Sequence, residues 1–140
     1  MFVTQVREAS AFAAASQRQI ATIRAQLDAL AVSGQRIAIW GGTGKAAAFM
    51  HFYGVDAERF PLVVDSDPGK VGTHVPGNGQ AIVFRDVLKD QPADVLIIPM
   101  QWRARDVLAE MAREGIAVGQ VLIEHDGRLV AFARGEHPYG

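Results

Sequence analysis

The fold is decided by residues 36–47, which read RIAIWGGTGKAA. The first five residues are mostly apolar and predict a short buried strand, and the compact helix that follows the glycines ends at Gly54. The glycine turn between them matches the dinucleotide-binding fingerprint G-x-G-x-x-G/A through Gly42, Gly44 and Ala47. We therefore expect a strand–turn–helix unit whose ligand-binding end is the turn.

Strands and helices alternate through the rest of the chain. Strands are expected at residues 61–65, 81–83, 94–99, 120–124 and 128–133, and helices at 45–53, 85–90 and 102–114. The dipeptide Asp126-Gly127 predicts a tight hairpin, because glycine tolerates the positive φ that such a turn requires. This order predicts an α/β fold: a Rossmann-like three-layer domain with right-handed crossovers, a mostly parallel sheet, and Ile37 and Val95 on adjacent strands.

A long helix is expected before this domain, over residues 5–32, because the segment has no Gly or Pro. Its apolar seam has steps of four and three residues and comprises Phe2, Val6, Ala9, Ala13, Ser16, Ile20, Ile23, Leu27 and Leu30. We expect the last four to pack on the domain, and the Ala-rich start to project or to pair with a second copy. The chain then divides into a lead-in helix (1–33), the α/β domain (34–133) and a tail (134–140).

The composition excludes several classes of function. The 140 residues include no cysteine, so disulfides, thiolate catalysis and Cys-based zinc sites are excluded. A formal net charge of −1 argues against a broad nucleic-acid-binding surface. No apolar run approaches the ~18 residues that a membrane span requires, and the first residues do not resemble a signal peptide. We therefore expect a cytoplasmic protein.

The candidate ligand-binding residues follow three of the expected strands. They are Gly41, Gly42, Thr43, Gly44, Lys45, Asp65, His74 and Trp102, with residues 66–80 as a lid. In such folds the start of the helix faces a phosphate, and an acid after the second strand binds ribose hydroxyls. The alternative is that the glycines only shape a turn. Valine at Gly44 is expected to block phosphate approach while leaving the fold mostly intact.

The remaining polar residues suggest no catalytic centre. The turn is not a P-loop, because Ile39 and Ala46 occupy positions where that motif requires glycine and Ser or Thr. Asp67 is expected to shape the turn with the proline and glycine that follow it. The four histidines have no metal-ligand spacing, and we expect His51 on a helix surface and His125 in the hairpin. No catalytic or metal-binding residue is assigned.

From Leu27 to about Phe132 the chain resembles the C-terminal domain of sugar C-methyltransferases. Four features carry the resemblance: residues 34–45 (GQRIAIWGGTGK), residues 64–72 (VDSDPGKVG), residues 75–77 (VPG) followed by Ala81-Ile82, and Trp102 after the strand at 94–99. The chain departs from the family pattern at Ala46, at Asn78-Gly79 and at Arg103.

The resemblance implies an accessory domain, stand-alone or excised, that helps to bind a nucleotide-linked deoxysugar. Methyl transfer would then need a separate catalytic domain or subunit that binds S-adenosylmethionine. Two other readings remain open: a small NAD(P)-binding protein with a redox or sensor function, and a structural module whose helix assembles oligomers. Homodimerisation through the long helix is compatible with each of these.

Overall fold

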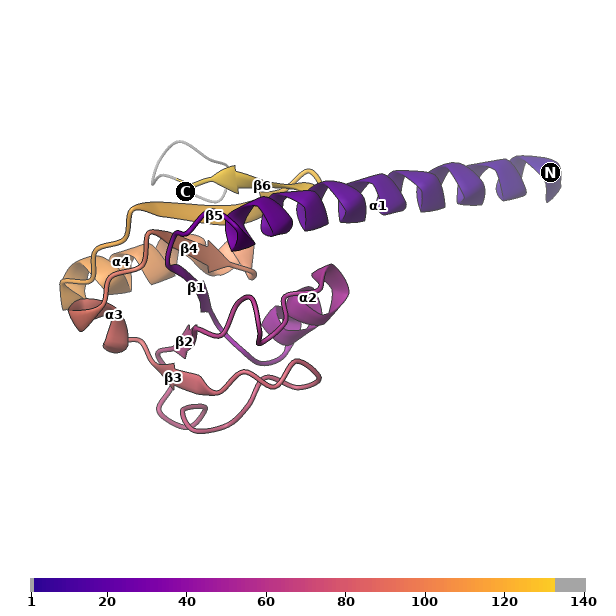
Figure 1. Ribbon diagram of the computed structural model, residues 1–140. Coiled ribbons are helices and arrows are strands. Elements are labelled where there is room, and N and C mark those ends of the chain that lie inside the picture. Colours follow the sequence, from indigo (N-terminus) through magenta and orange to yellow (C-terminus); the bar gives the residue numbers. More distant parts are fainter. Residues whose placement is uncertain (1, 133–140) are drawn as a thin grey trace.

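The computed structural model describes the backbone of residues 2–132 and the side chains of residues 16–132. Its centre is a six-stranded sheet in the order β3-β2-β1-β4-β5-β6 (Figure 1). The strands are β1 (Ile37–Trp40), β2 (Val63–Asp65), β3 (Ile82–Phe84), β4 (Val95–Ile98), β5 (Gln120–His125) and β6 (Arg128–Ala131). The chain is therefore a mixed α/β protein with a mostly parallel sheet, as the sequence predicts.

Helices cover both faces of this sheet. They are α1 (Phe2–Ala31), α2 (Lys45–Tyr53), α3 (Val87–Asp90), a 3-10 helix η1 (Gln101–Arg103) and α4 (Ala104–Glu114). One buried cluster joins the sheet to α1 and α2 through Ile23, Leu27 and Met50. The second joins the other face to α3 and α4 through Leu88 and Met111. Strand residues alternate between the two clusters because successive side chains of a strand point to opposite faces.

Two specific expectations about the sheet are confirmed. Ile37 pairs with Val95, so β1 and β4 are adjacent parallel strands. The hairpin between β5 and β6 turns at Asp126 and Gly127, whose φ angles are +52° and +77°. Positive φ at both central residues is the geometry of a type I′ turn, which matches the twist of antiparallel strands.

Most predicted boundaries are shifted by one to three residues, and two of these shifts have a clear local cause. The strand predicted at 81–83 is Ile82–Phe84, because Ala81 pairs with His74 in an isolated bridge outside the main ladder. The helix predicted from residue 102 begins as the 3-10 turn η1, and α4 starts at Ala104. Both shifts fall at the ends of elements, where loop contacts decide the local pairing.

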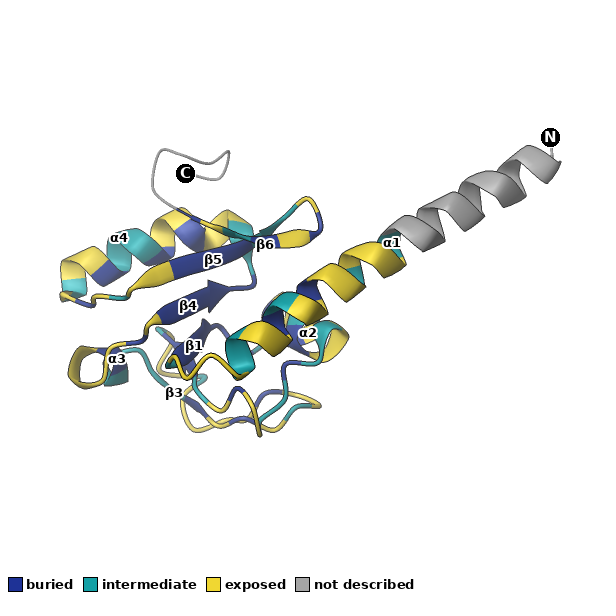
Figure 2. Cartoon of the chain, turned by 45° about the horizontal axis from the view of Figure 1, so that its top comes forward, coloured by how far each residue is buried: buried dark blue, intermediate teal, exposed yellow. Residues whose placement is uncertain are grey.

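Helix α1 docks on the domain through its second half (Figure 2). Ile23 and Leu27 are fully buried, whereas Ile20 and Leu30 are half-buried. Gln26 exchanges two hydrogen bonds with the backbone of Leu129 on the edge strand β6, at 2.8 and 2.7 Å. The side chains of the seam residues Phe2, Val6, Ala9 and Ala13 lie outside the described residues. No helix of the described residues is long and apolar enough to cross a membrane.

Candidate functional site

The glycine turn lies where the order of the strands reverses. β1 pairs with β2 on one side and with β4 on the other, so the loops after β1 and β4 leave the same sheet edge side by side. A Cβ added at Gly41 would lie 3.5 Å from Cε of Met100, which follows β4. Open α/β sheets bind ligands at such a reversal, outside the carboxyl ends of the strands.

Lys45 and Trp102 meet across this reversal. Lys45 is the first residue of α2, and Trp102 lies in η1, directly after β4. The Lys45 Nζ atom lies 5.0 Å from the centre of the Trp102 ring, a cation–π contact. Trp102 is 50% exposed and Lys45 is exposed, so both residues remain accessible to a ligand.

The glycines of the turn have two local roles. Gly41 has a φ of +98° and Gly44 a φ of +57°, values that favour glycine. A Cβ at Gly42 would lie 2.6 Å from Ile82 Cδ1 and 3.1 Å from Val63 Cγ1, so Gly42 lets the turn approach β2 and β3. A Cβ at Gly44 would meet nothing within 4 Å, which leaves open space beside the start of α2.

The start of α2 carries unbonded amides. The hydrogen bonds of the described residues leave the amides of Thr43, Gly44 and Lys45 without a protein acceptor, and no side chain caps the helix. Such amides and the helix dipole favour an anion. The turn therefore offers donors, a positive charge on Lys45 and space beside Gly44 in one place.

The geometry corrects one expectation about Gly44. Its φ of +57° and ψ of −126° are adopted by glycine and rarely by other residues. Valine at this position strains the backbone although there is room for its side chain, so Gly44→Val combines a loss of stability with any block of phosphate approach. Substitutions of Lys45 and Trp102, both exposed, test the site without this strain.

Asp65 ends β2 beside the turn. The residue is 6% exposed, and its Oδ1 accepts a hydrogen bond of 2.9 Å from the amide of Asp67. Among the described residues this amide is the one protein donor to the carboxylate. Asp67 in turn accepts a 2.9 Å bond from the Gly69 amide, which confirms that Asp67 shapes the turn after β2. The ligand role of Asp65 stays a prediction.

The 66–80 loop runs beside β3 and then turns toward the end of α2. Gly72 and Thr73 bond to Ile82 alongside β3. The later residues turn toward the end of α2, where the side-chain amides of Asn78 and Gln80 both donate to the carbonyl of Val55. Sequence reasoning did not identify Phe84, which ends β3 and lines a dent of about 280 Å³ with Pro68 and Val71. A predicted strand boundary one residue later would have placed Phe84 at the carboxyl edge of the sheet.

The described histidines lie away from the turn. His74 pairs through its backbone with Ala81, which precedes β3, whereas Asp65 pairs with Phe84 at the other end of that strand. His51 is in the last turn of α2, near Gly77, and His125 lies beside Asp126 in the hairpin. The sheet edge therefore brings together the turn, Lys45, Asp65 and Trp102, but not His74.

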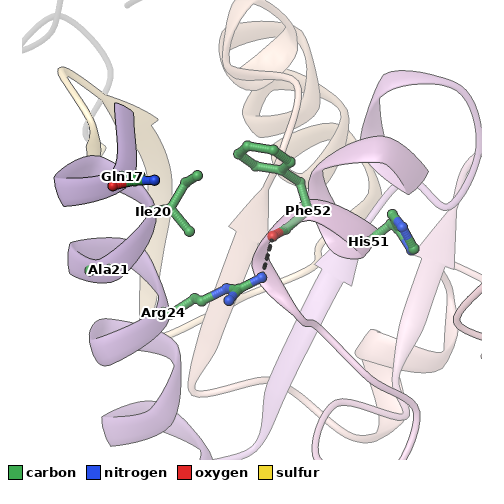
Figure 3. Close-up of a pocket in the computed structure, with 6 residues that line it drawn as sticks. All are labelled: Gln17, Ile20, Ala21, Arg24, His51 and Phe52. Carbon is green, nitrogen blue, oxygen red and sulfur yellow. Dashed lines mark hydrogen bonds between the residues drawn. The ribbon is translucent and has the colours of Figure 1, made fainter. Parts of the chain in front are cut away.

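A groove that is larger than the dent beside Phe84 lies between α1 and α2 (Figure 3). Its volume is about 550 Å³, and it is lined by Gln17, Ile20, Ala21, Arg24, His51 and Phe52. Arg24 donates a 3.0 Å hydrogen bond to the carbonyl of Phe52 and so links the two helices. This groove is at the opposite end of α2 from Lys45, and it is separate from the sheet edge.

The fold and this edge define an α/β domain with a glycine turn at a strand-order reversal. The comparison with protein families gives its family. The family described as C-methyltransferase C-terminal domain matches residues 1–124, and the chain belongs to that family. A search of curated proteins found no match to this chain.

Proposed function

We propose that the chain is a Rossmann-like domain that binds the nucleotide-sugar substrate of a sugar C-methyltransferase. The family supplies the reaction class. The observation that carries the proposal is the Lys45–Trp102 pair beside the unbonded amides of the turn. A diphosphate is the group of such a substrate that needs these donors and this charge.

Each residue of the edge has a distinct part in this proposal. The amides of the turn and the hydroxyl of Thr43 donate to the diphosphate, and Lys45 offsets its charge. Asp65 accepts from ribose or sugar hydroxyls. Trp102 offers a half-exposed ring at the side of β4. The Asp65→Ala variant is expected to weaken nucleotide binding by roughly 1–3 kcal/mol through the loss of a charged hydrogen bond.

In this proposal, methyl transfer needs a separate domain that binds S-adenosylmethionine. The chemistry requires a group positioned to take a proton from the sugar carbon. Among the described residues at the sheet edge, this proposal assigns Lys45 to the diphosphate and Asp65 to ribose or sugar hydroxyls. The described histidines lie elsewhere. This proposal therefore leaves neither Lys45 nor Asp65 to act as the base. We expect no methylated sugar from the purified chain, its substrate and S-adenosylmethionine.

A thermal-shift panel tests the binding role. It compares thymidine diphosphate and its sugars with NAD, NADP and S-adenosylmethionine, because a ligand selective for the folded state raises the melting temperature. The proposal predicts a rise with the diphosphate and its sugars. A rise with NAD or NADP alone would support the redox or sensor alternative.

Paired variants then locate the binding. Lys45→Met is expected to reduce affinity for thymidine diphosphate by roughly 1–3 kcal/mol, because it removes a charged donor. Arg113→Met is the matched control: it removes the same charge from the last turn of α4. Equal affinities for the two variants would count against the edge as the binding site.

The partner proposed for α1 is a methyltransferase catalytic domain or a second copy of the chain. A helix of 30 residues is about 45 Å long at 1.5 Å per residue. In Figure 1 its first half extends beyond the sheet. Sedimentation of the purified chain tests the second copy: a monomer at all concentrations leaves the catalytic domain as the proposed partner.

A further inference from the structure

We infer that the nucleobase of the substrate binds in the dent formed by Pro68, Val71 and Phe84, which we name the base dent. This inference rests on the proposed function and adds an orientation to it. The base lies over β3, and the sugar at the other end of the diphosphate lies toward β4 and Trp102.

The turn, Asp65 and Phe84 follow one another across three adjacent strands. Gly42 packs over Val63 of β2 and Ile82 of β3, and Asp65 and Phe84 follow those two residues by two positions. Side chains two apart on a strand share a face, so Asp65 and Phe84 lie on the face of the turn, one step closer to the carboxyl edge. The two residues are also paired in the β2–β3 ladder.

The spacing fits a nucleotide. Neighbouring strands lie about 4.8 Å apart, so the turn after β1 and Phe84 on β3 are separated by roughly 10 Å, with Asp65 between them. A nucleotide has the same succession of groups: a phosphate for the turn, ribose hydroxyls for the carboxylate, and a flat base for the apolar dent.

The base dent has a fixed aromatic wall. Its volume is about 280 Å³, and its three lining residues are apolar. The Arg85 guanidinium lies 4.7 Å from the centre of the Phe84 ring. Arg85 is itself held by Glu110, at 2.5 Å, and by Asp86. Because these ion pairs fix the guanidinium against the ring, the ring is ordered before a base arrives. Preorganised aromatic rings stack on bases of any sequence.

The experiment compares uridine 5′-monophosphate with ribose 5-phosphate by calorimetry. The two probes share the phosphate and the ribose, so the ratio of their dissociation constants reports the base alone. For the wild-type chain we expect uridine monophosphate to bind roughly tenfold more tightly, the effect of one stacked base. Adenosine monophosphate compared with ribose 5-phosphate, and thymidine monophosphate compared with 2-deoxyribose 5-phosphate, identify the preferred base in the same way.

Two variants locate the effect. Phe84→Leu keeps an apolar side chain on β3 but removes the flat ring, and Val71→Ser alters the exposed wall of the dent. Each variant is expected to reduce the ratio of the two dissociation constants toward one and to leave the affinity for ribose 5-phosphate unchanged. Val32→Ser, at a position that is 86% exposed at the end of α1, is the matched control and is expected to keep the full ratio.

The outcomes separate the inference from the function on which it rests. If both probes bind equally well to the wild-type chain, or if the ratio survives in Phe84→Leu and Val71→Ser, the base dent is overturned and the phosphate site stands. If neither these probes nor thymidine diphosphate binds, the proposed function itself is overturned, and the base dent with it.

Discussion

At the scale of single residues, the turn uses glycine for two separate reasons. Gly42 is needed for packing, because its missing side chain leaves room for Ile82. Gly41 and Gly44 are needed for positive φ angles. The sequence pattern predicts the turn but does not separate these roles, because they depend on β2 and β3, which come later in the chain.

We predict that Gly44→Val destabilises the fold by about 1–3 kcal/mol through backbone strain. Thr43→Val is the matched control, because Thr43 has no positive φ and valine preserves its shape. The measurement is the free energy of unfolding in urea for both variants. Equal stability of Gly44→Val and the wild-type chain would show that this backbone conformation imposes no strain.

Asp56 gives a prediction about pH. The backbone amide of Arg59 donates to its carboxylate at 2.8 Å, and the Arg59 guanidinium adds a 3.0 Å bond. These hydrogen bonds hold the pKa of Asp56 below its ordinary value of 3.8, and the bond from the Arg59 backbone amide has the largest effect. Since the pKa is lower in the folded state, the ionised group stabilises the fold above the unfolded pKa, and this contribution is lost as pH falls through the folded pKa.

Asp56→Asn is therefore expected to lose less stability than the wild-type chain as the pH falls below about 5. The difference should stay below about 1 kcal/mol, because the Arg59–Asp56 ion pair is half exposed to solvent. Urea unfolding over a series of pH values measures it. Parallel stability curves for the two proteins would contradict the assigned role of these hydrogen bonds.

At the scale of elements, α1 is attached to the domain by a short part of its length. Ile23 and Leu27 are buried, and Gln26 bonds to the edge strand β6. The heptad pattern predicts the buried pair, because it marks one face of the helix. It does not predict the Gln26 contact, because pairing with the Leu129 backbone depends on where the C-terminal hairpin lies.

We predict that Leu27→Ala destabilises the fold by about 2–5 kcal/mol, because it removes apolar contacts and leaves a cavity between α1 and the sheet. Val32→Ala, at an exposed position just after the same helix, should change stability by less than about 0.5 kcal/mol. Thermal and urea unfolding of both variants tests the difference. A small effect of Leu27→Ala would mean that the domain is stable without α1.

At the scale of the whole molecule, the sequence predicts the α/β class and the mostly parallel sheet. Periodicity and glycine spacing carry that information locally. They do not predict that Lys45 lies over Trp102, because the contact joins residues on two strands that are adjacent only after folding. They also misplace His74, whose position in the 66–80 loop says nothing about which end of β3 it meets.

The central claim is that the carboxyl edge of the sheet, and not the larger groove between α1 and α2, binds a nucleoside diphosphate. The most direct measurement is a nuclear magnetic resonance titration of the ¹⁵N-labelled chain with thymidine diphosphate, followed through the backbone amides. We predict that the largest shift changes fall in residues 41–47, 65–72 and 101–103. Shift changes confined to residues 17–24 and 51–52, which line the groove, would contradict the claim.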